Sequence, residues 1–185
     1  MTTLQERVRN LAIKKLLFEY FVFQLEQWKQ EKHPRFHVSF TKLKLQKILF
    51  LVASVKSKEN TYPLLNVFNR FYALPYGPVE IDIYDAMNDS SFKNISFIGN
   101  ECQTRFTKES FAELDQSLVL AMTEAIQAIK NMGVDYISMT PFELVDITHK
   151  WTSWQVAMQV AEMCNSKREP MSTNDIISST VKAYK

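Results

Sequence analysis

The amino-acid sequence predicts a mainly α-helical protein, a single domain of about six to eight helices with one small β-hairpin. Three observations predict this fold class. Apolar residues recur at helical spacing along most of the chain, the pattern alternates only within residues 94–106, and proline or glycine separates the helical stretches. With 185 residues, the chain can bury about 70% of the surface that its unfolded form exposes, which suits one domain over residues 1–185.

Composition favours a cytoplasmic globular protein without a membrane anchor. Apolar residues make up 46% of the chain and charged residues 23%, which are ordinary values for a folded domain. The N-terminal residues lack the apolar core of a signal peptide, and no segment approaches about 18 uncharged apolar residues. Cys102 and Cys164 lie far apart and form no CxxC motif, so we expect no disulfide framework.

The formal net charge of +2 hides an uneven distribution of charged residues. Residues 29–58 contain eight Lys and Arg residues against Glu31 alone, whereas residues 79–124 contain nine acidic residues against three basic ones. Such electrical polarity suits a charged partner, or two copies of the chain that meet head to tail.

Helical signals dominate the first third of the chain. A capping-box pattern predicts a helix from Thr3 to about Lys29, and Pro34 stops it because proline disfavours helical geometry in the preceding residue. Thr41 can cap a second helix, and apolar residues cover most of its circumference, so we expect this helix to be central and mostly buried. Residues 64–71 form a shorter helical piece that ends before the next proline.

The rest of the chain predicts the hairpin and further helices. Alternating residues on either side of Gly99 predict two strands within residues 94–106. Helical patterns follow over residues 114–133, 140–148, 153–163 and 172–181. The expected core includes nine apolar residues: Leu45, Ile48, Leu49, Val52, Phe71, Leu118, Met122, Ile126 and Trp154.

The stretch ALPYGPVEIDIYDAM, residues 73–87, holds two prolines and one of the three glycines of the chain. We predict that Gly77 caps a helix that starts at Pro78, and that Tyr76 projects from the rigid turn before it. Asp82, Asp85 and Asp89 then share one helix face. This face is either solvated or a docking face for a basic partner, and a metal site is disfavoured because hard cations draw ligands from tighter loops.

No motif indicates catalysis. The chain has no glycine-rich phosphate loop, no HExxH motif and no paired cysteines. His33, His37 and His149 lack metal-ligand spacing, and a proton-transfer role for them is less favoured than a solvated or capping role. We therefore expect a protein that is not an enzyme and that binds neither a metal nor an organic cofactor.

The basic helix over Lys42–Lys58 leaves a second function class open. Lys44, Lys47 and Lys58 share one wedge of this helix and could contact phosphates, as in a nucleic-acid-binding or phage-associated regulatory protein. Leu51 intrudes into the wedge, and the acidic residues elsewhere would repel a phosphate backbone. Nucleic acid is therefore the less favoured partner.

Three sequence blocks, taken in order, resemble the Panacea antitoxin domain family, the group of phage-associated and SocA-like proteins. The blocks are Lys44-Leu-Gln-Lys-Ile-Leu-Phe50, then Phe71-Tyr-Ala-Leu-Pro-Tyr-Gly-Pro-Val79 leading to Tyr84, then Thr148-His149 followed by Trp154. The resemblance covers about residues 41–177 and leaves residues 1–33 as an additional N-terminal helix. Leu74 stands where the family usually has tryptophan.

The resemblance implies a non-enzymatic antitoxin that neutralises a cognate toxin, encoded nearby, by direct binding. It does not imply which residues contact the toxin, which toxin is bound, or the oligomeric state. Physical reasoning places the binding surface near Tyr76 and Trp151. Tyr76 sits on a rigid turn, and Trp151 lies between two helices, where we expect it to remain partly exposed. Asp82, Asp85 and Asp89 offer a second, charged surface that would speed association.

Overall fold

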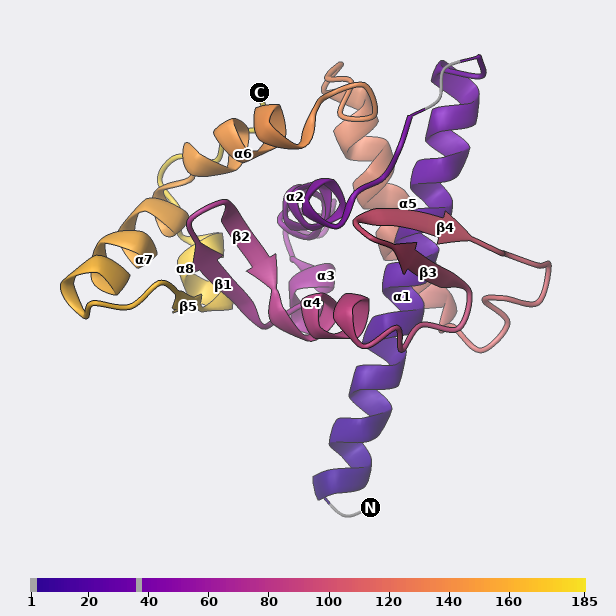
Figure 1. The fold of residues 1–185 in the computed structure, drawn as a ribbon, viewed down its shortest axis with the longest axis horizontal. Coiled ribbons are helices and arrows are strands. Elements are labelled where there is room, and N and C mark those ends of the chain that lie inside the picture. Colours follow the sequence, from indigo (N-terminus) through magenta and orange to yellow (C-terminus); the bar gives the residue numbers. More distant parts are fainter. Residues whose placement is uncertain (1–2, 36–37) are drawn as a thin grey trace.

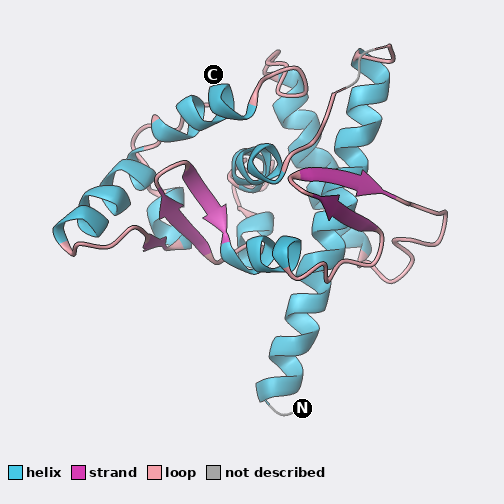
Figure 2. Cartoon of the chain, in the orientation of Figure 1, coloured by secondary structure: helices cyan, strands magenta, loops and turns pink. Residues whose placement is uncertain are grey.

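The structure is a computed structural model that describes residues 3–35 and 38–185. Within these residues, 54% are helical and 11% lie in strands, and the elements are eight helices and two small antiparallel sheets (Figure 2). Of the three histidines, His33 and His149 lie within the described residues, and His37 lies outside them.

The predicted fold class is wrong, because the domain is mixed α/β and not mainly helical with a single hairpin. Strands β3 (Ile95–Ile98) and β4 (Glu101–Thr104) form the expected hairpin around Gly99. A second antiparallel sheet, in the order β2-β1-β5, consists of β1 (Phe71–Leu74), β2 (Gly77–Glu80) and β5 (Glu169–Met171).

The second sheet escaped prediction for physical reasons. All four residues of β2 are buried, so the strand shows no alternation of apolar and polar residues. Pro78 within β2 argues against a strand, but β2 is an edge strand, where a missing N–H is tolerated. Strand β5 has three residues and pairs with β1 across about a hundred residues of sequence, a distance that local patterns do not report.

Helix α2 (Lys42–Ala53) is the central helix, as expected, and Figure 1 shows it end-on in the middle of the molecule. The side chain of Thr41 caps it by accepting a hydrogen bond from the N–H of Lys44, and all its residues from Lys44 onward are buried. Seven of the nine predicted core residues are buried, while Leu118 and Trp154 are only partly buried against the core.

Helix α1 (Thr3–Lys32) is the longest element, with 30 residues. Its C-terminal two thirds pack on the core, but its N-terminal end extends past the rest of the chain (Figure 1). Residues 3–12 are all exposed, and the first buried residue is Lys14.

Six further helices complete the fold: α3 (Pro63–Val67), α4 (Ile81–Asn88), α5 (Gln116–Asn131), α6 (Pro141–His149), α7 (Thr152–Met163) and α8 (Thr173–Ile177). A capping box of Thr140 and Glu143 starts α6, at the beginning of the helical pattern predicted over residues 140–148. The predicted cap at Gly77 is wrong, because α4 begins at Ile81 and its cap is Glu80, whose carboxylate accepts a hydrogen bond from the N–H of Ile83.

The central position of α2 makes a packing prediction. Ile48 is fully buried, so Ile48→Ala should lower the free energy of unfolding by about 2 to 5 kcal/mol through lost contacts and a cavity. Ile98→Ala is the matched control, since this exposed isoleucine should cost below about 1 kcal/mol. Urea unfolding followed by tryptophan fluorescence measures both, and equal losses would contradict the central placement of α2.

Candidate functional site

Two neighbouring side chains of α2 hold the outer edge of strand β2. The Nζ atom of Lys47 donates a hydrogen bond to the carbonyl of Pro78 at 2.6 Å. The side-chain amide of Gln46 accepts from the N–H of Glu80 at 2.9 Å and donates to its carbonyl at 3.3 Å. We call these contacts of Gln46 and Lys47 with β2 the α2–β2 clamp. They satisfy backbone groups that an edge strand would otherwise leave unpaired.

The turn between β1 and β2 packs directly against the clamp and α6. Gly77 has a φ of +92°, a value that L side chains rarely adopt. A Cβ atom placed on Gly77 would lie 2.6 Å from Oγ1 of Thr148 and 3.1 Å from Cε of Lys47. Only glycine therefore allows this close approach.

A second set of contacts fastens the same turn from α6 and α7. The rings of His149 and Trp154 stack at 3.8 Å between centroids with an interplanar angle of 10°. The indole N–H of Trp154 donates to the carbonyl of Leu74 at 3.0 Å, and the imidazole of His149 bonds to the backbone of Pro75. Residues from α2, α6 and α7 thus converge on one turn.

Tyr76 stands exposed at the tip of this braced turn. Its side chain is 61% exposed, and its ring lies edge-on to that of Phe142, with centroids 6.2 Å apart. Phe142, in the first turn of α6, is 63% exposed. We call Tyr76 and Phe142 the aromatic pair. Beside it, Pro75 and Trp154 line an open pocket of about 580 Å³ along α7.

Sequence reasoning missed Phe142. Its exposure could have been predicted from helical spacing. In the helix that starts at the capping box, Phe142 lies on the same side as the exposed Asp146 and away from the buried Leu144. This position predicts that the ring of Phe142 is exposed to solvent, but a single exposed ring does not by itself mark a binding surface.

The expectation that Trp151 remains partly exposed is wrong. Its side chain is 0% exposed, its N–H donates to the carbonyl of Ala183 at 2.6 Å, and its ring packs edge-on against Phe50 and Tyr184. The short link between α6 and α7 turns Trp151 inward. Trp151 therefore fastens the C-terminal segment to the core.

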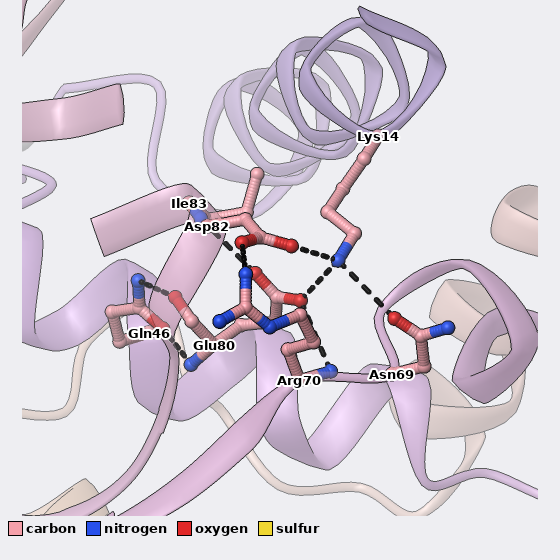
Figure 3. Close-up of polar contacts among 7 residues, drawn as sticks. All are labelled: Lys14, Gln46, Asn69, Arg70, Glu80, Asp82 and Ile83. Carbon is pink, nitrogen blue, oxygen red and sulfur yellow. Dashed lines mark hydrogen bonds and ion pairs between the residues drawn. The ribbon is translucent and has the colours of Figure 1, made fainter. Parts of the chain in front are cut away.

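The three aspartates of α4 do not form one free acidic face. Asp82 pairs with Lys14, at 2.5 Å, and with Arg70 (Figure 3). Asp85 and Asp89 are exposed. Two of the three carboxylates are therefore available to a partner.

The cluster in Figure 3 also contains a buried ion pair that the sequence did not reveal. Nζ of Lys14 lies 2.6 Å from Oε1 of Glu80, and both side chains are nearly inaccessible. Burial raises the pKa of Glu80, and the charge and hydrogen bond of Lys14 oppose that rise. The signal for Lys14 was its helical spacing from the apolar residues Phe18 and Phe21 on the core-facing side of α1.

The basic wedge predicted on α2 does not face solvent. Lys44 and Lys47 are buried, and Nζ of Lys44 donates to the carbonyls of Ile137 and Met139 at 2.6 and 2.7 Å. Burial lowers the pKa of Lys47 to about 7 and that of Lys44 to about 8. Lys58 does not belong to the helix at all, because α2 ends at Ala53; it is exposed, and its Nζ lies 3.5 Å from Oε1 of Glu124.

His149 and the acidic residues form no reactive arrangement within the described residues. The Nε2 atom of His149 is buried and has no hydrogen-bond partner there. Burial is the main cause that lowers the pKa of His149, and the nearby charge of Lys47 lowers it further. In the part of the chain that the structure describes, no group of three or more His, Cys, Asp or Glu side chains could hold a metal ion. No described helix has both the length and the apolarity needed to cross a membrane.

The geometry defines a small α/β scaffold braced around one exposed turn. The family model of the antitoxin SocA-like, Panacea domain matches residues 45–155, more than half of the chain, and the chain belongs to this family. The match contains the α2–β2 clamp and the aromatic pair but not α1. The family description supports an antitoxin-like role. Searches of curated proteins and of solved structures found no match.

The close packing at Gly77 makes a specific prediction. Gly77→Ala should destabilise the fold by about 2 to 4 kcal/mol, because it adds a steric overlap with Thr148 to the cost of a positive φ. Gly133→Ala is the matched control, since Gly133 also has a positive φ but open space around it. Thermal or urea unfolding measures both variants.

A double-mutant cycle with Thr148→Ala tests the cause of the Gly77 effect. Removing Oγ1 should recover part of the loss in the Gly77→Ala background, because the closest obstructing atom is gone. Strictly additive losses, or equal losses in the two glycine variants, would contradict the steric explanation.

The buried lysines predict a dependence of stability on pH. The folded pKa values of Lys47 and Lys44 lie below the ordinary value of 10.5, so the unfolded chain binds more protons between about pH 7 and 10. The free energy of unfolding should therefore rise by about 2 kcal/mol from pH 7 to 8.5. Lys47→Met should remove most of this rise.

Lys58→Met serves as the control for the pH measurement, since Lys58 is exposed and should leave the rise unchanged. Urea unfolding at the two pH values gives the comparison. A wild-type stability that stays level over this interval would show that Lys47 keeps its proton in the folded state.

Proposed function

We propose that this chain is an antitoxin that neutralises a cognate protein toxin, encoded nearby, by direct binding and without catalysis. The family match supports the antitoxin role. The observation that carries the proposed location is the aromatic pair, two largely exposed rings beside a turn that is held by α2 on one side and by α6 and α7 on the other. The proposed compartment is the bacterial cytoplasm, where a neighbouring gene would also produce its toxin.

The braced turn suits a binding surface because it limits the entropy lost on association. Pro75 and Gly77 flank Tyr76, and the Gly77 backbone is packed against Thr148 and Lys47, so the turn has little freedom left to lose. Rigid aromatic anchors of this kind are common hot spots, and their truncation costs about 2 kcal/mol or more of binding energy.

The other predicted contact residues take different parts in this proposal. Trp151 supports the surface from below, because it joins α6 and α7 to the core. Asp85 and Asp89 offer a charged face that mainly speeds association with a basic partner. Asp82 is left out of the proposed contact face, because it already pairs with Lys14 and Arg70.

Co-expression with the adjacent open reading frame tests the proposal. The neighbour alone should stop growth, and this chain should restore it. Tyr76→Ala and Phe142→Ala should each weaken the complex about thirtyfold or more, as expected for hot-spot truncation, and reduce rescue. Calorimetry with purified proteins measures the affinity.

Tyr84→Ala is the matched control, because Tyr84 is an exposed tyrosine on α4, away from the turn. It should bind and rescue like the wild type. In a separate arm, reversing the charges of Asp85 and Asp89 should lower the association rate more than it raises the dissociation rate. A harmless neighbour would refute the toxin pairing, and full binding by both aromatic-pair variants would refute the surface.

A further inference from the structure

The N-terminal end of α1 carries an apolar stripe that nothing in the described chain covers. We call residues 3–12 the N-terminal arm. Leu4, Val8 and Leu11 are 71%, 62% and 40% exposed, and their spacing places them on one side of the helix. The arm lies outside the residues that match the family and on a different element from the aromatic pair.

A groove of about 840 Å³ runs beside this stripe. The arm and the start of the packed part of α1 form one wall through Arg7, Leu11 and Lys14, and the segment after α3 contributes Asn69 and Arg70. Apolar and charged side chains therefore line a concave surface next to an exposed helix face. Such a surface fits a rod-shaped ligand.

Charge indicates what could occupy the groove. Residues 3–15 contain four basic residues against Glu6 alone. Within the described residues, no acidic side chain pairs with Arg7 or Arg9. The one acid that lines the groove, Asp82, is already neutralised by Lys14 and Arg70. Arg7 and Arg9 against Glu6 thus leave the arm with a small excess of positive charge, and Arg7 places part of it in the groove beside the apolar stripe.

This charge argues against a second copy of the same arm as the occupant. An arm from another copy would bring its own Arg7 against the Arg7 that lines the groove, and like charges at close range oppose association. A flat membrane is also a poor fit, because the lining of the groove is concave and comes from several elements: α1, α3 with the segment after it, α4 and α5.

We propose that the N-terminal arm and its groove bind an acidic amphipathic helix of another protein. The apolar residues of that helix would cover Leu4, Val8 and Leu11, and its carboxylates would meet Arg7, which lines the groove beside the stripe. Because residues 3–12 make few contacts with the core and short isolated helices are marginal in water, packing against a partner helix would also stabilise the arm. The chain would then have two separate docking surfaces.

The probe for this surface is a synthetic acidic helix of about 18 residues, with leucines at helical spacing and glutamates beside them. The full chain should bind it with a micromolar Kd that weakens as salt is added. A matched peptide with lysine in place of each glutamate should not bind. Fluorescence anisotropy of the labelled peptides measures both, and absence of binding by the acidic peptide at 100 micromolar chain (about 5.5 kcal/mol of affinity) would overturn the proposal.

Matched variants locate the binding. Val8→Asp and Arg7→Glu should each lower the affinity at least about tenfold. Val156→Asp is the control, since Val156 is an exposed valine on α7 and its substitution should have no effect. Circular dichroism melting confirms that each variant is folded, and equal affinity of the Val8 and Val156 variants would overturn the proposed location.

Two further measurements separate this proposal from its alternatives. If sedimentation shows that the wild type self-associates and that Val8→Asp does not, the occupant is a second copy and the proposal is overturned. If the wild type binds anionic vesicles but not the acidic peptide, the occupant is a lipid surface and the proposal is likewise overturned. Toxin rescue by Val8→Asp should equal that of the wild type. Lost rescue by Val8→Asp with normal rescue by Tyr76→Ala would place the toxin on the arm and refute two separate surfaces.

Discussion

The α2–β2 clamp is the constraint on which the rest of the structure depends. Strand β2 has four buried residues and lies at the edge of its sheet, so its outer backbone groups need partners that water cannot supply. Gln46 and Lys47 provide those partners from the central helix. Burying the amino group of Lys47 is costly, and its lowered pKa records that cost, but the carbonyl of Pro78 gives it a hydrogen-bond acceptor. The clamp thereby determines where the turn before β2 stands.

Strand β2 also connects the clamp to the turn that carries Tyr76 and to helix α1. At its start, Gly77 lets the turn approach Thr148, and this approach leaves Tyr76 exposed. At its end, Glu80 bonds to α2 through its backbone, while its carboxylate caps α4 and pairs with Lys14 of α1. An ion pair at the end of β2 therefore joins α1 to this strand, in addition to the apolar side chains that α1 buries in the core. Removal of either partner would leave an uncompensated buried charge.

Sequence reasoning succeeded where a signal is local and failed where it depends on distant contacts. The hairpin around Gly99 and the burial of α2 follow from spacing within short segments. Strand β5 pairs with β1 across a long stretch of chain, and no local pattern reports that pairing. Lys47 appeared to belong to a solvated wedge, because an almost wholly apolar helix gives no indication of which side its few lysines face. Trp151 was misplaced because the position of a link between helices does not reveal the direction of its side chain.

The order of the sequence blocks can now be understood as one set of contacts. Gln46 and Lys47 come from the first block, and the backbone that they bind comes from the second. Thr148, which packs on Gly77, comes from the third. Each of these side chains contacts a backbone group in another block. A substitution in one block alone therefore leaves a buried polar group without a hydrogen-bond partner or creates a steric overlap. The ring of Tyr76 is exposed and takes no part in these contacts between blocks. The residue at this position can therefore change to suit a binding partner without destabilising the fold.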